Sequence, residues 1–127
     1  MFHLTKIENA RMPVPEPEYL DVGSAAIEAG ETLTVKSGKL VKETTAPTHV
    51  AAAAAAANAV NVPVFRITND QVYEVPCATS PSAFVAGAKL AINADGLQVG
   101  AVSDSGAVTV VNTLGAKAIG DTILIRF

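Results

Sequence analysis

The chain repeats itself, and the repeat limits what it can fold into. The stretch AGETLTVKSGKLV, residues 29–41, matches AGAKLAINADGLQV, residues 86–99, with one inserted residue. Leu33 aligns with Leu90, and in each copy a second aliphatic residue follows two positions later, which is the period of a half-buried strand. The tetrapeptides KSGK and NADG supply residues that tight turns need. Each copy therefore predicts a strand, a turn and a second strand.

Both copies end in a further strand, VPVFRI in the first and TILIRF in the second, so that Arg66 aligns with Arg126. We therefore predict an internal repeat of residues 29–67 and 86–127. The expected fold is all-β, a small β-barrel or β-clip-like (β-tulip) domain of about eight short strands over residues 22–127. Little helix is expected beyond one turn near residues 81–85, where a proline stands at the start.

Seven consecutive alanines, Ala51 to Ala57, favour a helix by local propensity. In the second copy, however, the corresponding stretch AVTVV is rich in β-branched residues and indicates a strand. A run of seven residues is also too short to form a stable helix alone. We expect a strand from His49 through about Ala54 and then a loop or one helical turn toward Asn58. Small side chains on both faces predict close packing between subunits, at Ala51, Ala52, Ala53 and Ala54.

The first 21 residues differ from the rest, because prolines at 13, 15 and 17 favour an extended backbone. We expect an N-terminal arm over residues 1–21 that orders against a partner or a neighbouring subunit, while the domain from residue 22 folds without it. A simple frayed terminus is the alternative. The residues expected to bind the partner are Met12, Pro13, Val14, Pro15, Glu16, Pro17 and Tyr19.

Composition excludes several classes of partner. The net charge is −3 with no Lys/Arg cluster, so no nucleic acid is expected, and no apolar run is long enough to span a membrane. The single cysteine, Cys77, excludes an internal disulfide framework, and we read no export signal. Charged residues make up only 17% of a chain with 23 alanines. This balance favours a subunit that hides surface in an assembly.

No catalytic, cofactor-binding or metal-binding residues are predicted. The two histidines, His3 and His49, are too few and too far apart to indicate a metal site, and Cys77 is expected to be a small buried thiol. Asp70 and Asp95 stand in turn contexts. A nucleophile elbow, a phosphate loop and the flanking residues of a lipoyl-type carrier lysine are missing. We therefore expect neither an enzyme nor a small-molecule substrate.

The pattern Leu33-Thr34-Val35, then Gly38-Lys39-Leu40-Val41, then Val50-Ala51-Ala52 and Val62-Pro63-Val64 resembles tailed-phage head-decoration proteins, also called capsid cement proteins. The closing GDTILI of the second copy resembles the last strand of the same class. The resemblance covers residues 22–127. It implies a small β-rich subunit, typically a homotrimer, that clamps neighbouring major capsid protein subunits on the outer capsid surface after synthesis in the host cytoplasm. It implies no enzymatic activity and no cofactor.

Two other readings stay open. One is a β-rich binding module of a phage spike or fibre base that recognises carbohydrate or another virion protein, although few aromatic residues are present for a sugar-binding face. The other is a trimeric dUTPase, which has a similar length and β content but whose phosphate-binding and uracil-reading signatures are missing here.

Overall fold

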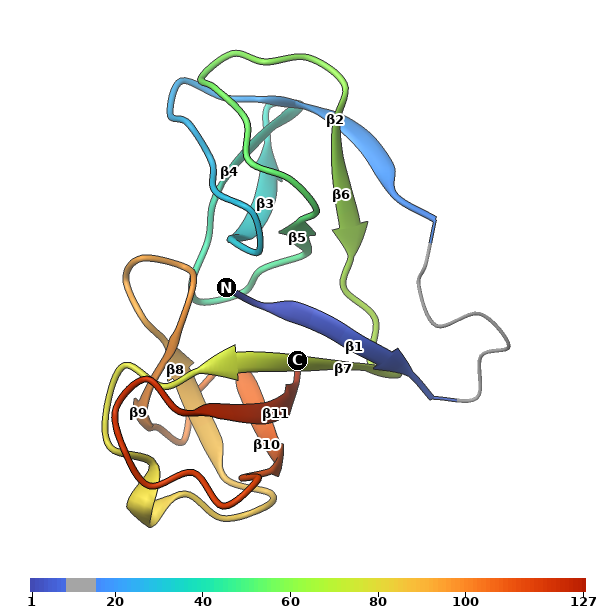
Figure 1. Cartoon of the computed structure of the whole chain (residues 1–127). Helices are drawn as coiled ribbons and strands as arrows, with labels where there is room; N and C mark the ends of the chain where they lie inside the picture. The colour runs from blue at the N-terminus through green and yellow to red at the C-terminus, as the bar shows by residue number, and fades with distance from the viewer. Residues whose placement is uncertain (9–15) are drawn as a thin grey trace.

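The computed structural model describes residues 1–8 and 16–127. Its strands form a closed barrel of order β2-β4-β3-β5-β6 and a six-stranded sheet of order β1-β7-β11-β10-β8-β9 (Figure 1). The all-β barrel prediction is thus confirmed. The elements are β1 His3–Ile7, β2 Glu18–Val22, β3 Thr32–Lys36, β4 Lys39–Lys42, β5 His49–Ala51, β6 Val62–Arg66, β7 Gln71–Pro76, the 3₁₀ helix η1 Pro81–Ala83, β8 Lys89–Ile92, β9 Val99–Val102, β10 Val108–Asn112 and β11 Thr122–Arg126.

The internal repeat is visible in the strand pairing. Strands β4-β3-β5-β6 follow one another in the barrel as β9-β8-β10-β11 do in the second sheet. Val22 of β2 pairs in parallel with Leu40, and Cys77, just after β7, makes a single parallel bridge to Val99. The repeat therefore includes β2 and β7, which precede the two predicted copies. We call β2–β6 (residues 18–66) the barrel unit and β7–β11 (residues 71–126) the second unit.

The turn predictions hold in detail. Ser37 and Gly38 connect β3 to β4 with φ values of 49° and 75°, the two positive angles that a tight hairpin turn requires. Asp95 accepts a hydrogen bond from the Leu97 N–H at 2.8 Å, which holds the turn between β8 and β9. The helical turn expected near residues 81–85 is η1.

The apolar side chains form two cores, one inside the barrel unit and one in the second unit, to which Val50 of β5 also contributes from the outer face of the barrel. Both clusters consist mainly of aliphatic side chains, each of which stabilises the fold by about 1.5–3 kcal/mol when fully buried. The barrel unit buries Val22, Ile27, Leu33, Leu40, Ala51, Val62 and Val64. The other core includes Phe2, Val50, Tyr73, Val75, Cys77, Leu90, Val99, Val108, Val110, Ile123 and Ile125.

The prediction of an N-terminal arm over residues 1–21 needs correction, because both described parts of it are strands. β1 pairs with β7, and the Phe2 side chain is only 1% exposed. β2 pairs with β6 on one side and β4 on the other, so it closes the barrel. Without β2 the edges of β4 and β6 would be left with unpaired backbone groups. Residues 2–7 and 18–22 therefore belong to the folded body.

The alanine run forms a shorter strand than predicted. β5 ends at Ala51, and the following alanines form a loop that returns through an isolated bridge between Ala55 and Ile27. The partner strand explains the stop. Ala52 N–H donates to the Pro63 carbonyl at 3.1 Å, but a proline has no N–H with which to return the bond. The loop then turns at Asn58, whose φ is 61°.

Candidate interaction site at the barrel mouth

One end of the barrel is lined by polar side chains that point inward. Glu18 pairs with Val64, and His49 pairs with Leu33. Residues paired across two strands point to the same face of the sheet. Because Val64 and Leu33 fill the barrel core, Glu18 and His49 point inward too. Arg66, two residues after Val64, follows the same alternation.

These side chains line a groove of about 430 Å³. Its lining combines aliphatic side chains, two threonines and the charged groups: Glu18, Leu20, Thr34, Val35, Thr48, His49 and Arg66. We call this groove, with the residues that line it, the barrel mouth.

Glu18 is the centre of the polar cluster. Arg66 donates from Nε to Glu18 Oε1 at 2.7 Å and from its terminal nitrogen to Oε2 at 3.2 Å. His49 Nε2 lies 3.2 Å from the same Oε2. The hydrogen bonds from Arg66, followed by the one with His49, hold the pKa of the Glu18 carboxyl below its usual value. The His49 ring is nearly enclosed, whereas the Arg66 side chain is 63% exposed.

A hydroxyl completes the cluster, since Thr48 Oγ1 lies 2.8 Å from His49 Nδ1. The order of hydroxyl, imidazole and carboxylate resembles a nucleophile relay. Here, however, Glu18 is held by two charge-assisted bonds from Arg66, and Thr48 also bonds the Thr34 hydroxyl at 3.3 Å. This arrangement is better suited to fixing the shape of the mouth than to moving a proton.

The position equivalent to the barrel mouth has different side chains in the second unit. Glu18 pairs with Val64, and Tyr73 pairs with Ile125. Val64 and Ile125 are equivalent core positions, because they pair with Ala51 and Val110 at the same point of the repeat. Glu18 is therefore equivalent to Tyr73.

Arg66, two residues beyond Val64, is equivalent by this register to Phe127, which corrects the sequence alignment of Arg66 with Arg126. The Phe127 ring packs edge-on against Tyr73, with the ring centroids 5.1 Å apart. Phe2, just before β1, covers it at a centroid distance of 5.4 Å. The polar and open mouth of the barrel unit thus corresponds to an apolar and covered one in the second unit.

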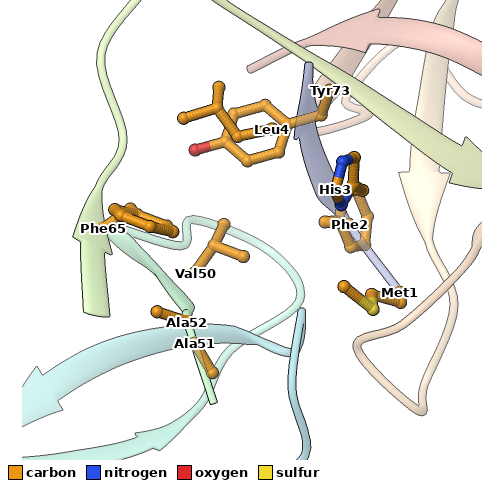
Figure 2. Close-up of a pocket in the computed structure, with 9 residues that line it drawn as sticks. All are labelled: Met1, Phe2, His3, Leu4, Val50, Ala51, Ala52, Phe65 and Tyr73. Carbon is orange, nitrogen blue, oxygen red and sulfur yellow. The ribbon is translucent and has the colours of Figure 1, made fainter. Parts of the chain in front are cut away.

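A smaller cavity of about 250 Å³ lies where β1 and β7 meet the barrel. Figure 2 shows β1 side chains and Tyr73 on one side of this cavity and Val50, Ala51, Ala52 and Phe65 on the other. Its walls are mostly apolar, and the Tyr73 hydroxyl donates to Gln71 Oε1 at 2.8 Å. Burial raises the pKa of that hydroxyl. We interpret this cavity as a packing gap between the units.

The residues predicted to bind a partner divide into three groups. Met12, Pro13, Val14 and Pro15 lie outside the described residues. Glu16 is exposed and Pro17 is half-buried, just before β2. Tyr19 lies on β2 with its side chain 62% exposed, on the outer face of the barrel.

The alanines predicted to pack between subunits have different environments. Ala51 is 3% exposed and belongs to the barrel core. Ala52 and Ala53 are half-buried, and Ala54 is exposed. The structure therefore separates these four residues, and only the last three lie at the surface.

The remaining candidates are simple to place. Cys77 is a free and buried thiol, and burial raises its pKa. Within residues 1–8 and 16–127, no three His, Cys, Asp or Glu side chains are grouped so that they could hold a metal ion. The same part of the chain has no helix with the length and apolar character needed to cross a membrane.

Comparison of the chain with protein-family models, with curated proteins and with solved structures finds no match. The barrel mouth itself was missed by sequence reasoning. A signal existed, because Glu18 stands two residues before Leu20 and Arg66 two residues after Val64, which are inward positions in their strands. A charge at an inward position near a strand end marks the rim of a barrel.

Proposed function

We propose that this chain is a structural virion protein that decorates the outside of a phage capsid by bridging neighbouring major capsid protein subunits. The sequence resemblance to head-decoration proteins supports this function, and so does the distribution of apolar side chains on the surface. A bridging subunit needs at least two separate contact areas, one for each neighbour that it joins.

The distribution of exposed apolar residues is the observation that carries the proposal. Large apolar side chains are exposed on both units: Tyr19, Val35 and Val60 on the barrel unit, and Val85, Val102, Val111, Leu114 and Ile119 on the second unit. The loop between β5 and β6 and the loops that precede β8 and β11 lie toward opposite ends of the molecule (Figure 1). Exposed apolar side chains at two ends favour contact with two neighbours.

In this proposal the docked protein is a homotrimer on the outer capsid surface. Each subunit contact removes apolar surface from water, at about 25 cal/mol per Å². The half-buried Ala52 and Ala53 remain candidates for the contact between subunits, because small side chains allow backbones to approach closely.

The test is binding to purified expanded heads, measured by sedimentation and negative-stain microscopy. The wild-type protein is expected to sediment with heads and to add regular outer density. Tyr19→Ser and Ile119→Ser change one exposed side chain on each unit, and each should weaken binding while the melting temperature stays unchanged. Asp104→Asn is the matched surface control. If the protein does not bind heads but binds purified tail fibres or spikes, it is a binding module of the fibre base and not a capsid decoration protein.

A further inference from the structure

Half of one edge of β2 has no neighbouring strand among the described residues. Glu18 and Leu20 pair with β6 through Val64 and Val62. Backbone groups alternate in direction along a strand, so the N–H and C=O of Tyr19 point away from β6. Pro63, opposite Tyr19, agrees with this, because its carbonyl accepts a hydrogen bond from the N–H of Ala52, just after β5, instead.

Pairing with β4 on that edge covers only the end of β2. It begins at Asp21, which pairs with Lys39. Within residues 1–8 and 16–127, the Tyr19 backbone groups therefore lie at an open edge beside the barrel mouth.

In the second unit the equivalent edge is occupied. Tyr73 is equivalent to Glu18, so Glu74 is equivalent to Tyr19. On β7, His3 pairs with Glu74 and Leu4 pairs with Tyr73, as β1 runs antiparallel along the edge. The repeat thus holds a strand in the second unit at the place where the described residues leave the edge of the barrel unit open.

We propose that an extended segment of the partner protein adds to β2 as β1 adds to β7, antiparallel and centred on Tyr19. The identification of that partner as the major capsid protein rests on the proposed function. The segment carries an aromatic residue, then any residue, then an aliphatic residue, as Phe2-His3-Leu4 does at the start of β1. Strand addition of this kind draws affinity from backbone hydrogen bonds and specificity from alternate side chains.

The side-chain pattern follows from the equivalent contacts. Phe2 covers Phe127, whose equivalent is Arg66. Glu18 bonds the edge of the Arg66 guanidinium, the Arg66 side chain is 63% exposed, and an aromatic ring stacks well on the planar face of a guanidinium. Leu4 lies opposite Tyr73, whose equivalent is Glu18. An aliphatic side chain there would enter the groove beside Leu20 and Val35.

The edge also limits how far pairing can extend. Pro17 has no N–H to donate, and β4 takes the edge from Asp21 onward. A proline next to an edge is a common protection against unlimited strand pairing. The edge can therefore pair with a short segment, but it cannot support the continuous strand pairing that would join many molecules into one sheet.

The first experiment uses the isotope-labelled full chain and the synthetic peptide acetyl-MFHLTKI-amide, which has the sequence of residues 1–7 and so includes β1. Titration to millimolar peptide should shift the NMR signals of Tyr19 and the Arg66 side chain and slow hydrogen exchange of the Tyr19 amide. A peptide with Phe2→Ser and Leu4→Ser should not do so. Saturable shifts centred on Glu74 instead, or none at Tyr19, would overturn the proposal.

A proline variant tests the contribution of the β2 backbone edge to binding separately from that of the Tyr19 side chain. Tyr19→Pro removes an N–H that the β2–β6 ladder does not use, so the melting temperature should stay the same. Peptide affinity should fall at least about tenfold, or ~1.4 kcal/mol. Tyr19→Ala keeps the N–H and should lose much less. Equal peptide affinity in the wild-type protein and Tyr19→Pro would overturn strand addition.

Binding of the same variants to expanded heads keeps the two proposals apart. If the peptide binds at Tyr19 but the wild-type protein does not bind heads, the strand-addition proposal holds and the capsid-decoration proposal fails. If Tyr19→Pro decorates heads as well as the wild-type protein, decoration stands and the edge is not its docking place.

Discussion

Arg66 and Phe127 occupy the same position in the two halves of the chain. Arg66 bonds Glu18 at 2.7 Å at the open mouth of the barrel, and Phe127 packs against Tyr73 under the cover of Phe2. The same backbone arrangement thus carries a partly exposed ion pair in the barrel unit and a covered aromatic cluster in the second unit. The difference follows from β1, which pairs with β7 of the second unit, whereas no equivalent strand among the described residues pairs with β2 at the barrel mouth.

The first prediction concerns that cover. Phe2→Ala should destabilise the protein by about 3–5 kcal/mol, because the ring is buried against Phe127 and its removal leaves a cavity. Deletion of residues 2–7 should destabilise it at least as much. Chemical denaturation followed by circular dichroism measures both effects. Tyr19→Ala, at an exposed site, should cost much less. If the deletion variant had the same free energy of unfolding as the wild-type protein, residues 2–7 would be an arm separate from the folded body.

The second prediction concerns Gly30, whose carbonyl accepts a hydrogen bond from Phe2 N–H at 3.0 Å. Its φ is 75°, and an added Cβ would lie 2.9 Å from the Phe2 backbone nitrogen and also contact Met1. Gly30→Ala should therefore combine about 1–2 kcal/mol of backbone strain with displacement of the start of β1. Faster hydrogen exchange in β1, measured by mass spectrometry, would show that displacement.

Gly38→Ala is the control for Gly30. It has the same φ of 75°, but nothing lies within 4 Å of its added Cβ. It should show the strain alone, with exchange in β1 unchanged. Equal losses of stability in the two variants would mean that the contact with β1 does not matter.

The repeat made most of the fold predictable from the sequence. Leu33 and Leu90 fill the two cores, and the hairpin at Ser37 and Gly38 forms as its residues indicate. The fates of β1 and β2 were not predictable in this way. Closing the barrel and covering the second unit are long-range pairings, and the local signal of Pro17 pointed to an extended arm instead.

The site was harder to predict than the fold. Sequence reasoning selected Tyr19 and its neighbours because they lie in a proline-rich segment that was expected to order against a partner, and the structure places Tyr19 on β2 with its side chain exposed. It did not bring Glu18, His49 and Arg66 together, because they come from three strands and meet only once the barrel closes. Their inward alternation was readable, but its meaning depends on which strand ends form the mouth.

The third prediction concerns the alanine run. Ala51→Leu should destabilise the protein by about 1–3 kcal/mol, because the methyl group is enclosed in the barrel core and a larger side chain overpacks it. Ala54→Leu, in the exposed loop, should have little effect on the free monomer. Thermal denaturation compares the two. Tolerance of leucine at Ala51 would show that the barrel core is loosely packed.

The same substitutions test the subunit contact. Ala52→Leu and Ala53→Leu should disturb the assembled form more than the monomer if these half-buried residues pack against a neighbour. Analytical ultracentrifugation, together with sedimentation on heads, measures this difference. Assembly identical to wild type in both variants would remove these two alanines from the interface.

The last prediction concerns the pH dependence of stability at the barrel mouth. Folding lowers the pKa of Glu18 from its usual 4.5, first because Arg66 donates hydrogen bonds to the carboxylate and then because His49 does. A carboxyl with a lowered pKa stabilises the fold fully above its unfolded pKa and loses that contribution as pH falls through the folded pKa. The melting temperature of the wild-type protein should therefore fall as the pH drops from about 5 to 3. Glu18→Gln removes the titrating group and should show a smaller fall, although a lower melting temperature at pH 7.

Part of the acid sensitivity should survive in Glu18→Gln. The pKa values of Asp21, Glu43 and Asp121 are also lowered, in each case chiefly by a backbone N–H that donates to the carboxylate. Asp104→Asn, in an exposed turn, is the matched control and should leave the pH profile as it is. Differential scanning calorimetry at several pH values gives the comparison. If Glu18→Gln and the wild-type protein lose the same number of degrees on acidification, the ion pair with Arg66 is too weakly coupled to folding to shape the mouth.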